Sequence, residues 1–379
     1  MKAYLILEDG NVFTGKSIGS TREMISEIVF NTSMTGYLEV LTDPSYAGQA
    51  VVMTFPLIGN YGICYEDMES RKPWVDGYIV REIARRPSNF RSEDSIETFL
   101  IEKDIPGIAG IDTRALTKIL REEGTMNGMI TTNENFVLED VIKQLKQHQT
   151  TKVVEKVTCK EKRIYSPKDY IATDAENARS GLKLHPYRKS NSKVALIDYG
   201  SKDNIANCLL KRGCEVTIYP AFTKAEEIIT DGPDGIMLSN GPGDPKECVE
   251  IIEEIKKLYQ TNIPIFAICL GHQLMALANG GDTRKLKYGH RGANHPVKDL
   301  KTGRVYISTQ NHGYVVEDGT ISDDVAETSF INANDSTVEG VHYLGKNIFT
   351  VQFHPEACSG PQDTEFLFDE FIQMMEVSK

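Results

Sequence analysis

One stretch of this sequence, residues 263–280, constrains the fold more than any other. It reads IPIFAICLGHQLMALANG, and its first part is a short apolar run typical of a strand that is buried on both faces. Apolar residues then recur at helical spacing. Cys269 falls at the predicted corner, where the unpaired amides of a helix N-terminus lower the pKa of a thiol. The stretch therefore predicts a parallel sheet with a candidate nucleophile at a strand-to-helix turn.

A cysteine that ends an apolar strand is more often part of the core, so Cys269 alone does not indicate catalysis. A second segment, residues 349–356, reads FTVQFHPE and predicts a strand leading to His354 and Glu356. Positions i and i+2 of an extended chain point the same way. Glu356 can therefore hold one imidazole nitrogen of His354 while the other faces the Cys269 sulfur. The three residues predict a nucleophile, a base and an orienting carboxylate.

Two other histidines compete for the role of the base. His272 follows Cys269 by three residues but has no carboxylate near it in the sequence, and His312 lies beside a predicted turn. His354 has Glu356 two residues away. A general base needs an orienting partner, so His354 is the preferred candidate.

The composition is that of a globular protein large enough for two domains, with 379 residues of which 40% are apolar and 25% charged. The formal net charge of −12 argues against nucleic acid and against an anionic membrane as partners, because both attract clustered positive charge. The first apolar run is stopped by Glu8 and Asp9, so it predicts neither a signal peptide nor a membrane anchor. We therefore expect a cytoplasmic protein.

The sequence contains seven cysteines and eight histidines. The cysteines form no Cys-x-x-Cys pair and their number is odd, which is typical of free thiols in a reducing compartment. The histidines show no His-Glu-x-x-His or related zinc spacing. We therefore predict no metal site on this chain.

Three segments are predicted along the chain. Residues 1–150 begin with strands at 3–7 and 25–31 and predict a smaller α/β domain. Residues 151–192 are charged and polar, which is typical of an interdomain linker. Residues 193–379 form the second predicted domain.

Strands and helices alternate in this second domain. The predicted strands are residues 194–198, 215–219, 235–238 and 263–268, with helical stretches between them. This alternation predicts an α/β fold with a doubly wound, mainly parallel sheet, whose ligands bind at the carboxyl ends of the strands. Cys269 lies at such an end.

The loop after the third of these strands reads LSNGPGDP over residues 238–245. Its glycines leave backbone amides open to a close approach by substrate. The loop lacks the Gly-Lys-Ser/Thr signature of a phosphate loop. Taken by itself, it is either one wall of an oxyanion hole or a tight turn.

The motif Cys-Leu-Gly-His-Gln, followed some eighty residues later by Gln-Phe-His-Pro-Glu, resembles the class I glutamine amidotransferases, which hydrolyse glutamine through a Cys-His-Glu triad. Three stretches of the first domain, residues 30–49, 55–62 and 110–124, resemble the amino-terminal domain of the small subunits of carbamoyl phosphate synthetases. Other glutamine amidotransferases lack this domain.

The resemblance implies that Cys269 is the nucleophile, His354 the base and Glu356 the residue that orients it. It also implies that the amides of Gly241 and Leu270 stabilise the tetrahedral oxyanion. Glutamine binding is assigned by the resemblance to Ser45, Gly241, Gly243, Leu270, Gln273, Asn311, Gly313 and Tyr314. Ser45 would bring the first domain to the edge of the glutaminase site.

The implied reaction is hydrolysis of glutamine to glutamate and ammonia through a thioester on Cys269. Nothing in the sequence resembles an ATP-binding domain, so no cofactor is expected on this chain. The resemblance implies a separate large subunit that binds ATP and Mg²⁺ and makes carbamoyl phosphate from bicarbonate and ammonia, for arginine and pyrimidine biosynthesis. The resemblance is also compatible with assembly of such heterodimers into a higher oligomer.

Two alternatives remain from the sequence. The glutaminase subunit of another amidotransferase would share the second domain but lack residues 1 to about 128. A non-catalytic binding module would not need Cys269, His354 and Glu356 together. The chain also departs from the family pattern at three places: Ala267 stands where glycine is usual, Cys358 and Ser359 where Ser-Pro is often found, and Tyr314 where phenylalanine is common. We expect the methyl group of Ala267 to be tolerated, because alanine is the next smallest residue.

Overall fold

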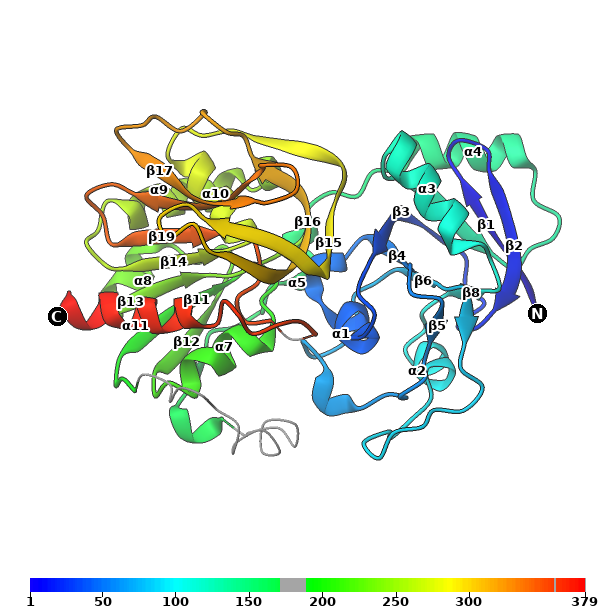
Figure 1. Ribbon diagram of the computed structural model, residues 1–379, viewed down its shortest axis with the longest axis horizontal. Helices are drawn as coiled ribbons and strands as arrows, with labels where there is room; N and C mark the ends of the chain where they lie inside the picture. The colour runs from blue at the N-terminus through cyan, green and yellow to red at the C-terminus, as the bar shows by residue number, and fades with distance from the viewer. Residues whose placement is uncertain (171–188, 358, 379) are drawn as a thin grey trace. The chain divides into compact units, whose positions relative to one another are not determined.

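The computed structural model describes residues 1–170, 189–357 and 359–378. It divides into two compact units (Figure 1). The first unit is Met1–Val153 with Leu286–Ala293, and the second is Val154–Lys285 with Asn294–Lys379. Within the described ranges, no helix combines the length and the apolar character needed to cross a bilayer.

A closed barrel forms the centre of the first unit, with strand order β1-β2-β8-β6-β4-β3-β9. The strands are β1 (Lys2–Leu7), β2 (Val12–Ser17), β3 (Met24–Asn31), β4 (Gln49–Met53), β6 (Gly77–Ile79), β8 (Gly107–Ala109) and β9 (Met126–Thr131). The pairs β3–β4, β4–β6 and β6–β8 are parallel, and the other neighbouring pairs are antiparallel. The predicted strands at 3–7 and 25–31 correspond to β1 and β3.

Four helices and a two-stranded sheet complete the unit. They are α1 (Tyr37–Thr42), α2 (Ile96–Glu102), α3 (Thr113–Glu123), α4 (Leu138–Gln147), and β5 (Leu57–Ile58) paired with β7 (Glu82–Ile83). Asp112 caps the start of helix α3, because its side chain accepts a hydrogen bond from the amide of Ala115. It ends at Gly124, which has a φ of 103°.

The second unit is built on a ten-stranded sheet of order β10-β12-β11-β13-β14-β19-β18-β17-β15-β16. The strands are β10 (Arg163–Tyr165), β11 (Lys193–Asp198), β12 (Glu215–Pro220), β13 (Gly235–Leu238), β14 (Ile265–Ile268), β15 (Thr283–Asp299), β16 (Val305–Val316), β17 (Ala326–Asn332), β18 (Val338–Tyr343) and β19 (Ile348–Val351). The five strands from β12 to β19 are parallel. This is the predicted doubly wound sheet.

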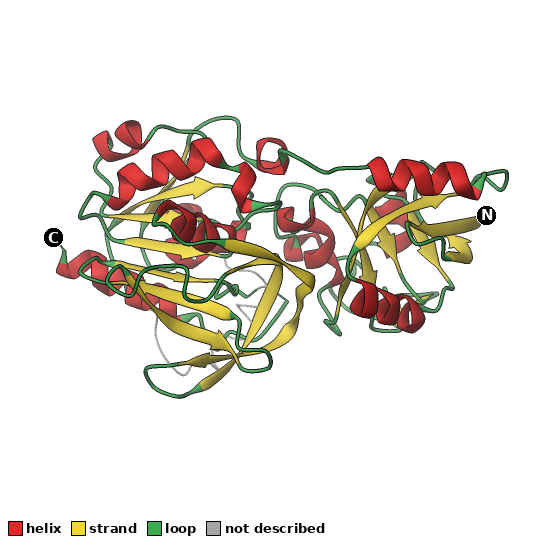
Figure 2. Ribbon diagram, turned by 90° about the horizontal axis from the view of Figure 1, so that it is seen from above, coloured by secondary structure: helices red, strands yellow, loops and turns green. Residues whose placement is uncertain are grey.

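Helices cover both faces of this sheet (Figure 2). One hydrophobic core contains residues of α8 (Ala225–Thr230), α9 (Val249–Tyr259) and α10 (Leu270–Ala278). The core on the other face contains residues of α7 (Asp203–Leu210) and α11 (Phe366–Val377). The sequence did not predict the long antiparallel extension formed by β15, β17 and β18.

The predicted linker, residues 151–192, contains α5 (Val153–Val157) and β10. Strand β10 pairs with β12 and therefore adds an antiparallel edge to the sheet of the second unit. Residues 171–188 of this segment lie outside the described residues, as does Cys358.

Candidate active site

Cys269 lies between β14 and α10, with φ 54° and ψ −105°. A positive φ is unfavourable for a residue with a side chain and is typical of a strained turn at a functional site. The turn is held by two hydrogen bonds, one from the Cys269 amide to the Val351 carbonyl (2.8 Å) and one from the Gln273 amide to the Cys269 carbonyl (3.1 Å). The predicted sharp turn between strand and helix is confirmed.

The backbone around this turn is packed too closely for larger residues. A Cβ atom on Gly271 would lie 2.6 Å from the Leu238 carbonyl oxygen. Ala267, in contrast, lies inside β14 and pairs with Leu238 and Thr350. Its φ is not positive, so this position does not require glycine. The methyl group is fully buried in the core, and the absence of a positive φ is consistent with the expectation that it is tolerated.

His354 and Glu356 form a buried pair just after β19. The His354 Nδ1 lies 2.6 Å from the Glu356 Oε1, and both side chains are completely buried. Burial by itself would raise the pKa of Glu356, but the neighbouring charges of His354 and Lys202 and the hydrogen bond from His354 lower it to about 2. Glu356 is therefore an anion at neutral pH.

The second ring nitrogen of His354 is available for proton transfer. Since Nδ1 bonds the Glu356 carboxylate, it carries a proton, and Nε2 carries the lone pair whenever the ring is neutral. Nε2 has no hydrogen-bond partner in the part of the chain that the structure describes. The amide of His354 donates to the Thr309 carbonyl (2.9 Å). This hydrogen bond holds the main chain of His354 in place.

Strand pairing brings Cys269 and His354 to the same edge of the sheet. Strands β14 and β19 are parallel neighbours in which Ile268 pairs with Val351. The residues that follow them, at 269 and from 352 onward, therefore leave the sheet at one carboxyl edge. Asn311 joins them there, because the Cys269 sulfur lies 3.8 Å from its carbonyl oxygen.

Lys202 is a site residue that the sequence analysis missed. Its Nζ lies 3.5 Å from the Glu356 Oε1, and the side chains of both residues are at most 3% exposed. Lys202 follows the end of β11, and its amide donates to Asn240 Oδ1 (3.1 Å). The one available signal was its place after a parallel strand, where ligands bind. Its burial could not be read from the sequence.

The loop after β13 lies against the start of α10. The amide of Gly271 donates to the Ser239 carbonyl (3.0 Å). A Cβ atom on Gly241 would lie 2.4 Å from the Tyr199 carbonyl oxygen, so this position accepts only glycine without a shift of the backbone. Leu270 is the first residue of α10, and its amide has no acceptor within the helix. The role of the Gly241 and Leu270 amides in an oxyanion hole stays a prediction.

Four more of the predicted glutamine-binding residues are close to one another. Gln273 Nε2 donates to the Tyr314 carbonyl and to Gln352 Oε1, both at 2.8 Å. Asn311 is buried, and Gly313 and Tyr314 follow it in β16. Gly243, at φ 93°, belongs to the loop after β13.

Ser45 is in the first unit, in the short helix η1 (Pro44–Tyr46), and is buried. Its amide donates to the Asp43 Oδ1 (2.8 Å). Its contact with glutamine stays a prediction.

The competing histidines have other contacts. His272 is fully buried, with Nδ1 2.7 Å from Thr350 Oγ1, and burial lowers its pKa to about 3. It is therefore neutral at physiological pH. His312 has both ring nitrogens engaged, by the Tyr314 carbonyl (2.8 Å) and by Gln310 Oε1 (3.0 Å). His354 remains the best candidate for the base.

One group in the first unit has the residue types of a metal site. Cys64, Glu66 and Asp67 place one ligand atom each within 4.8 Å of one another. Arg91 already pairs with Asp67 at 2.6 Å and with Glu66 at 2.9 Å. A guanidinium in this position competes with a cation, so we assign no metal to this group.

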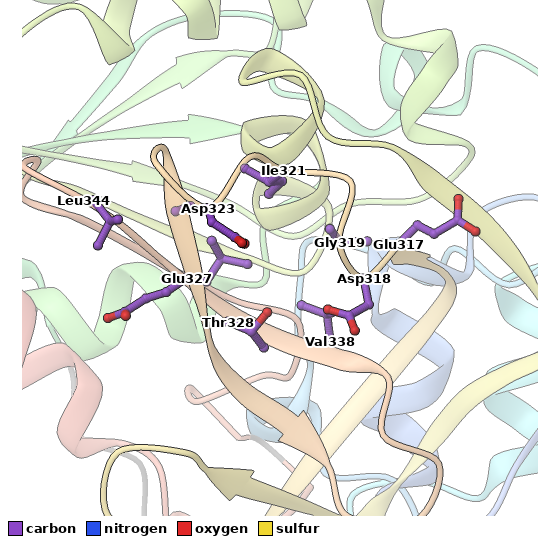
Figure 3. A pocket seen from close by; sticks show the side chains of 12 residues that line it. Glu317, Asp318, Gly319, Ile321, Asp323, Glu327, Thr328, Val338 and Leu344 are labelled. Carbon is purple, nitrogen blue, oxygen red and sulfur yellow. The ribbon is translucent and has the colours of Figure 1, made fainter.

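A cavity of about 350 Å³ is present elsewhere in the second unit (Figure 3). Its walls come from residues 316–344 and carry four carboxylates, from Glu317, Asp318, Asp323 and Glu327. None of the residues that line it is a predicted site residue. The cavity is therefore not the predicted glutamine site.

Two family descriptions match the chain. "Carbamoyl-phosphate synthase small chain, CPSase domain" matches residues 5–130, and "Glutamine amidotransferase class-I" matches residues 195–374.

Curated relatives are similar along the whole length. A "Carbamoyl phosphate synthase small chain" of Clostridium perfringens is 51% identical over 373 residues, which cover 98% of this chain and 99% of the relative. A protein of the same description from Listeria monocytogenes is 49% identical, with 99% and 97% covered. A "Carbamoyl phosphate synthase pyrimidine-specific small chain" of Halalkalibacterium halodurans is 46% identical, with 100% and 98% covered.

Proposed function

Since the chain belongs to the carbamoyl-phosphate synthase small chain family, we propose that it hydrolyses glutamine and passes the ammonia to a large synthase chain. The observation that carries the proposal is the buried His354–Glu356 pair at the same sheet edge as the strained Cys269 turn. A match of residues 5–130 to the synthase small-chain domain argues against the glutaminase of another amidotransferase.

In the first half of the reaction, the Cys269 sulfur attacks the carboxamide carbon of glutamine while the thiol proton passes to His354 Nε2. The resulting tetrahedral oxyanion receives hydrogen bonds from the amides of Gly241 and Leu270. The carbon–nitrogen bond then breaks, and the proton held by His354 goes to the leaving nitrogen. The products of this half are ammonia and a glutamyl thioester on Cys269.

In the second half, His354 takes a proton from water as the water oxygen attacks the thioester carbon. The carbon–sulfur bond breaks, glutamate leaves, and the proton returns to the Cys269 sulfur. Glu356 holds the proton-bearing Nδ1 of His354 throughout, and its negative charge stabilises the imidazolium that forms in both halves. Lys202 is a positioning residue, because it contacts Glu356 and touches no reacting atom.

The remaining predicted residues would bind glutamine around this centre. Because Gln273 uses its side-chain nitrogen for Tyr314 and Gln352, it would contact the substrate through its side-chain oxygen. The hydrogen bond from Gln273 to the Tyr314 carbonyl holds the backbone of Tyr314, and with it the segment that contains Asn311 and Gly313. Ser45 and Gly243 would complete the binding site.

The synthase step would take place on the partner. We propose a large chain that binds ATP and Mg²⁺ and combines the ammonia with bicarbonate to give carbamoyl phosphate for arginine and pyrimidine biosynthesis. A cytoplasmic location is supported by the six cysteines in the described residues, all of which are free thiols.

The test is glutamate release from glutamine by the purified chain, alone and with the large synthase chain of the same organism, with Cys269→Ser as the control. We expect a rate that depends on Cys269 and rises when the partner is added. A rate that survives in Cys269→Ser would refute the role of the cysteine. A rate that ignores the partner would refute the coupling.

A further inference from the structure

The main-chain carbonyl of Glu356 accepts a hydrogen bond from a distant side chain. Glu356 follows Pro355 in a turn that is closed by a hydrogen bond from the Ala357 amide to the His354 carbonyl (3.3 Å). Glu356 is only 2% exposed, and a buried carbonyl needs a donor. Among the described residues, no main-chain amide donates to this oxygen. The donor is the side-chain nitrogen Nδ2 of Asn204.

Asn204 and Lys202 hold Glu356 from two sides. Lys202 is the N-cap of α7, and Asn204 is the second residue of that helix. Lys202 Nζ lies 3.5 Å from the carboxylate Oε1, whereas Asn204 Nδ2 donates to the main-chain carbonyl. A carbonyl oxygen only accepts, so the Asn204 amide has its nitrogen toward Glu356. The lysine compensates the charge of the carboxylate, and the asparagine holds the main chain that carries it.

A role in its own helix does not explain the contact that Asn204 makes. Asparagine is favoured at the N-cap, where its side chain accepts a hydrogen bond from an amide of the first turn. Lys202 occupies the N-cap of α7, and asparagine is one of the less favourable residues inside a helix. The side chain of Asn204 donates to a residue 152 positions away. The contact therefore indicates a role at the site.

Helix α7 is a rigid support for this hydrogen bond. Ile205, Cys208 and Leu209 are fully buried in the core that α7 shares with α11. Arg212, just past the end of α7, donates to the two carboxylate oxygens of Asp369 in α11 at 2.9 and 3.0 Å and to the Cys208 carbonyl at 2.9 Å. A donor on a packed helix positions its acceptor more precisely than one on a loop.

The main chain of Glu356 sets the geometry of the catalytic pair. The Glu356 Oε1 lies 2.6 Å from His354 Nδ1, and Pro355 is the one residue between them. Proline has no amide hydrogen with which to tie this turn to the rest of the fold. A displacement of about 1 Å at a catalytic group can slow a reaction about 100-fold. Any shift of the Glu356 main chain is therefore expected to slow the reaction.

We propose that Asn204 is a positioning residue for glutamine hydrolysis, whose hydrogen bond to the Glu356 carbonyl holds the carboxylate in line with His354 Nδ1. The inference rests on the proposed function, which supplies the reaction. Asn204 touches no reacting atom and acts through Glu356. Its loss should therefore lower kcat and leave the KM for glutamine unchanged.

The test compares Asn204→Ala with Asn207→Ala in glutamate release from glutamine, measured with the large synthase chain present. Asn207 is the matched control, because it lies in the same helix and is also half-buried. In Asn204→Ala, kcat should fall about 10-fold or more, with KM within about threefold of the wild type. Asn207→Ala should change neither value by more than about threefold.

Asn204→Leu separates the hydrogen bond from the space that the side chain fills. Leucine has nearly the same branched shape but cannot donate, so this variant should lose as much kcat as Asn204→Ala. Both variants should keep the rate of carbamoyl phosphate synthesis from free ammonia, and urea unfolding checks that each is folded in the assay. A kcat of Asn204→Leu equal to that of the wild type would show that the side chain only fills space, and would refute the inference.

A double-mutant cycle tests whether Asn204 acts through Glu356. In a chain that already carries Glu356→Gln, the charge to be positioned is absent. Adding Asn204→Ala should then lower kcat by less than about threefold, so the two effects should not be additive. A further loss of about 10-fold would show that Asn204 acts independently of the carboxylate, which contradicts the proposal.

The outcomes separate the inference from the proposed function. If the wild-type complex hydrolyses glutamine and Asn204→Ala does so at the same rate, the positioning role is refuted and the proposed function stands. If the wild-type complex releases no glutamate, both are refuted. If Asn204→Ala raises KM and leaves kcat unchanged, Asn204 serves substrate binding, and the inference is again refuted.

Discussion

Replacing Glu356 by glutamine should slow glutamine hydrolysis about 100-fold. In the folded protein its pKa is about 2 against an ordinary value of 4.5, which corresponds to a preference for the anion of about 3 kcal/mol. Glutamine keeps the shape and an oxygen that accepts from His354 Nδ1, but it has no charge. The imidazolium that forms on His354 then loses at most about 3 kcal/mol of electrostatic stabilisation. A loss of that size in the transition state lowers kcat by a factor of about 10².

The same substitution should destabilise the fold. It removes the carboxylate next to Lys202, whose side chain is only 3% exposed, and losing one partner of a buried pair costs about 3 kcal/mol. The pKa of Glu356 is lowered in the folded state, so the stability that it contributes is present above pH 4.5 and is lost as the pH falls toward 2. The difference in unfolding free energy should therefore be constant from pH 6 to 8 and shrink below pH 4.5.

Two further variants separate catalysis from stability. Adding Lys202→Met to Glu356→Gln removes the buried cation and should restore part of the stability but none of the activity. Asp369→Asn removes another carboxylate of the second unit, which pairs with Arg212 at 2.9 Å, and should lower stability without changing kcat. The readouts are glutamate release in the presence of the large chain and urea unfolding. If kcat of Glu356→Gln stays within about threefold of the wild type, the assigned role of the carboxylate is wrong.

Four other substitutions test the site. Cys269→Ser should abolish carbamoyl phosphate synthesis from glutamine and leave synthesis from free ammonia nearly intact; equal loss of both rates would mark the residue as structural. Gly241→Ala, whose Cβ would lie 2.4 Å from the Tyr199 carbonyl oxygen, should cost about 1–3 kcal/mol in urea unfolding and lower kcat; unchanged values would contradict the close contact. His354→Asn should lose at least about 10³-fold in kcat, whereas His272→Asn should keep the pH profile of the wild type, since the pKa of that buried imidazole is about 3. A shifted profile in the second variant would show that the base is misassigned.

Local patterns in the sequence predicted the parts of the site that depend on neighbouring residues. The apolar run before Cys269 and the helical spacing after it located the turn, because strand and helix periodicities are properties of a few consecutive residues. His354 and Glu356 are two positions apart, so an extended chain brings them together without any help from the rest of the fold.

Contacts between distant segments were decided only by the tertiary structure. Lys202 reaches Glu356 because β11, β13, β14 and β19 are neighbours in one sheet, and no local pattern indicates which strands will be adjacent. The antiparallel extension of that sheet and the closed barrel of the first unit depend on pairings of the same long-range kind. Sequence periodicity therefore determined the elements and the chemistry at their ends, and packing between elements decided which charges are buried and which side chains remain on the surface.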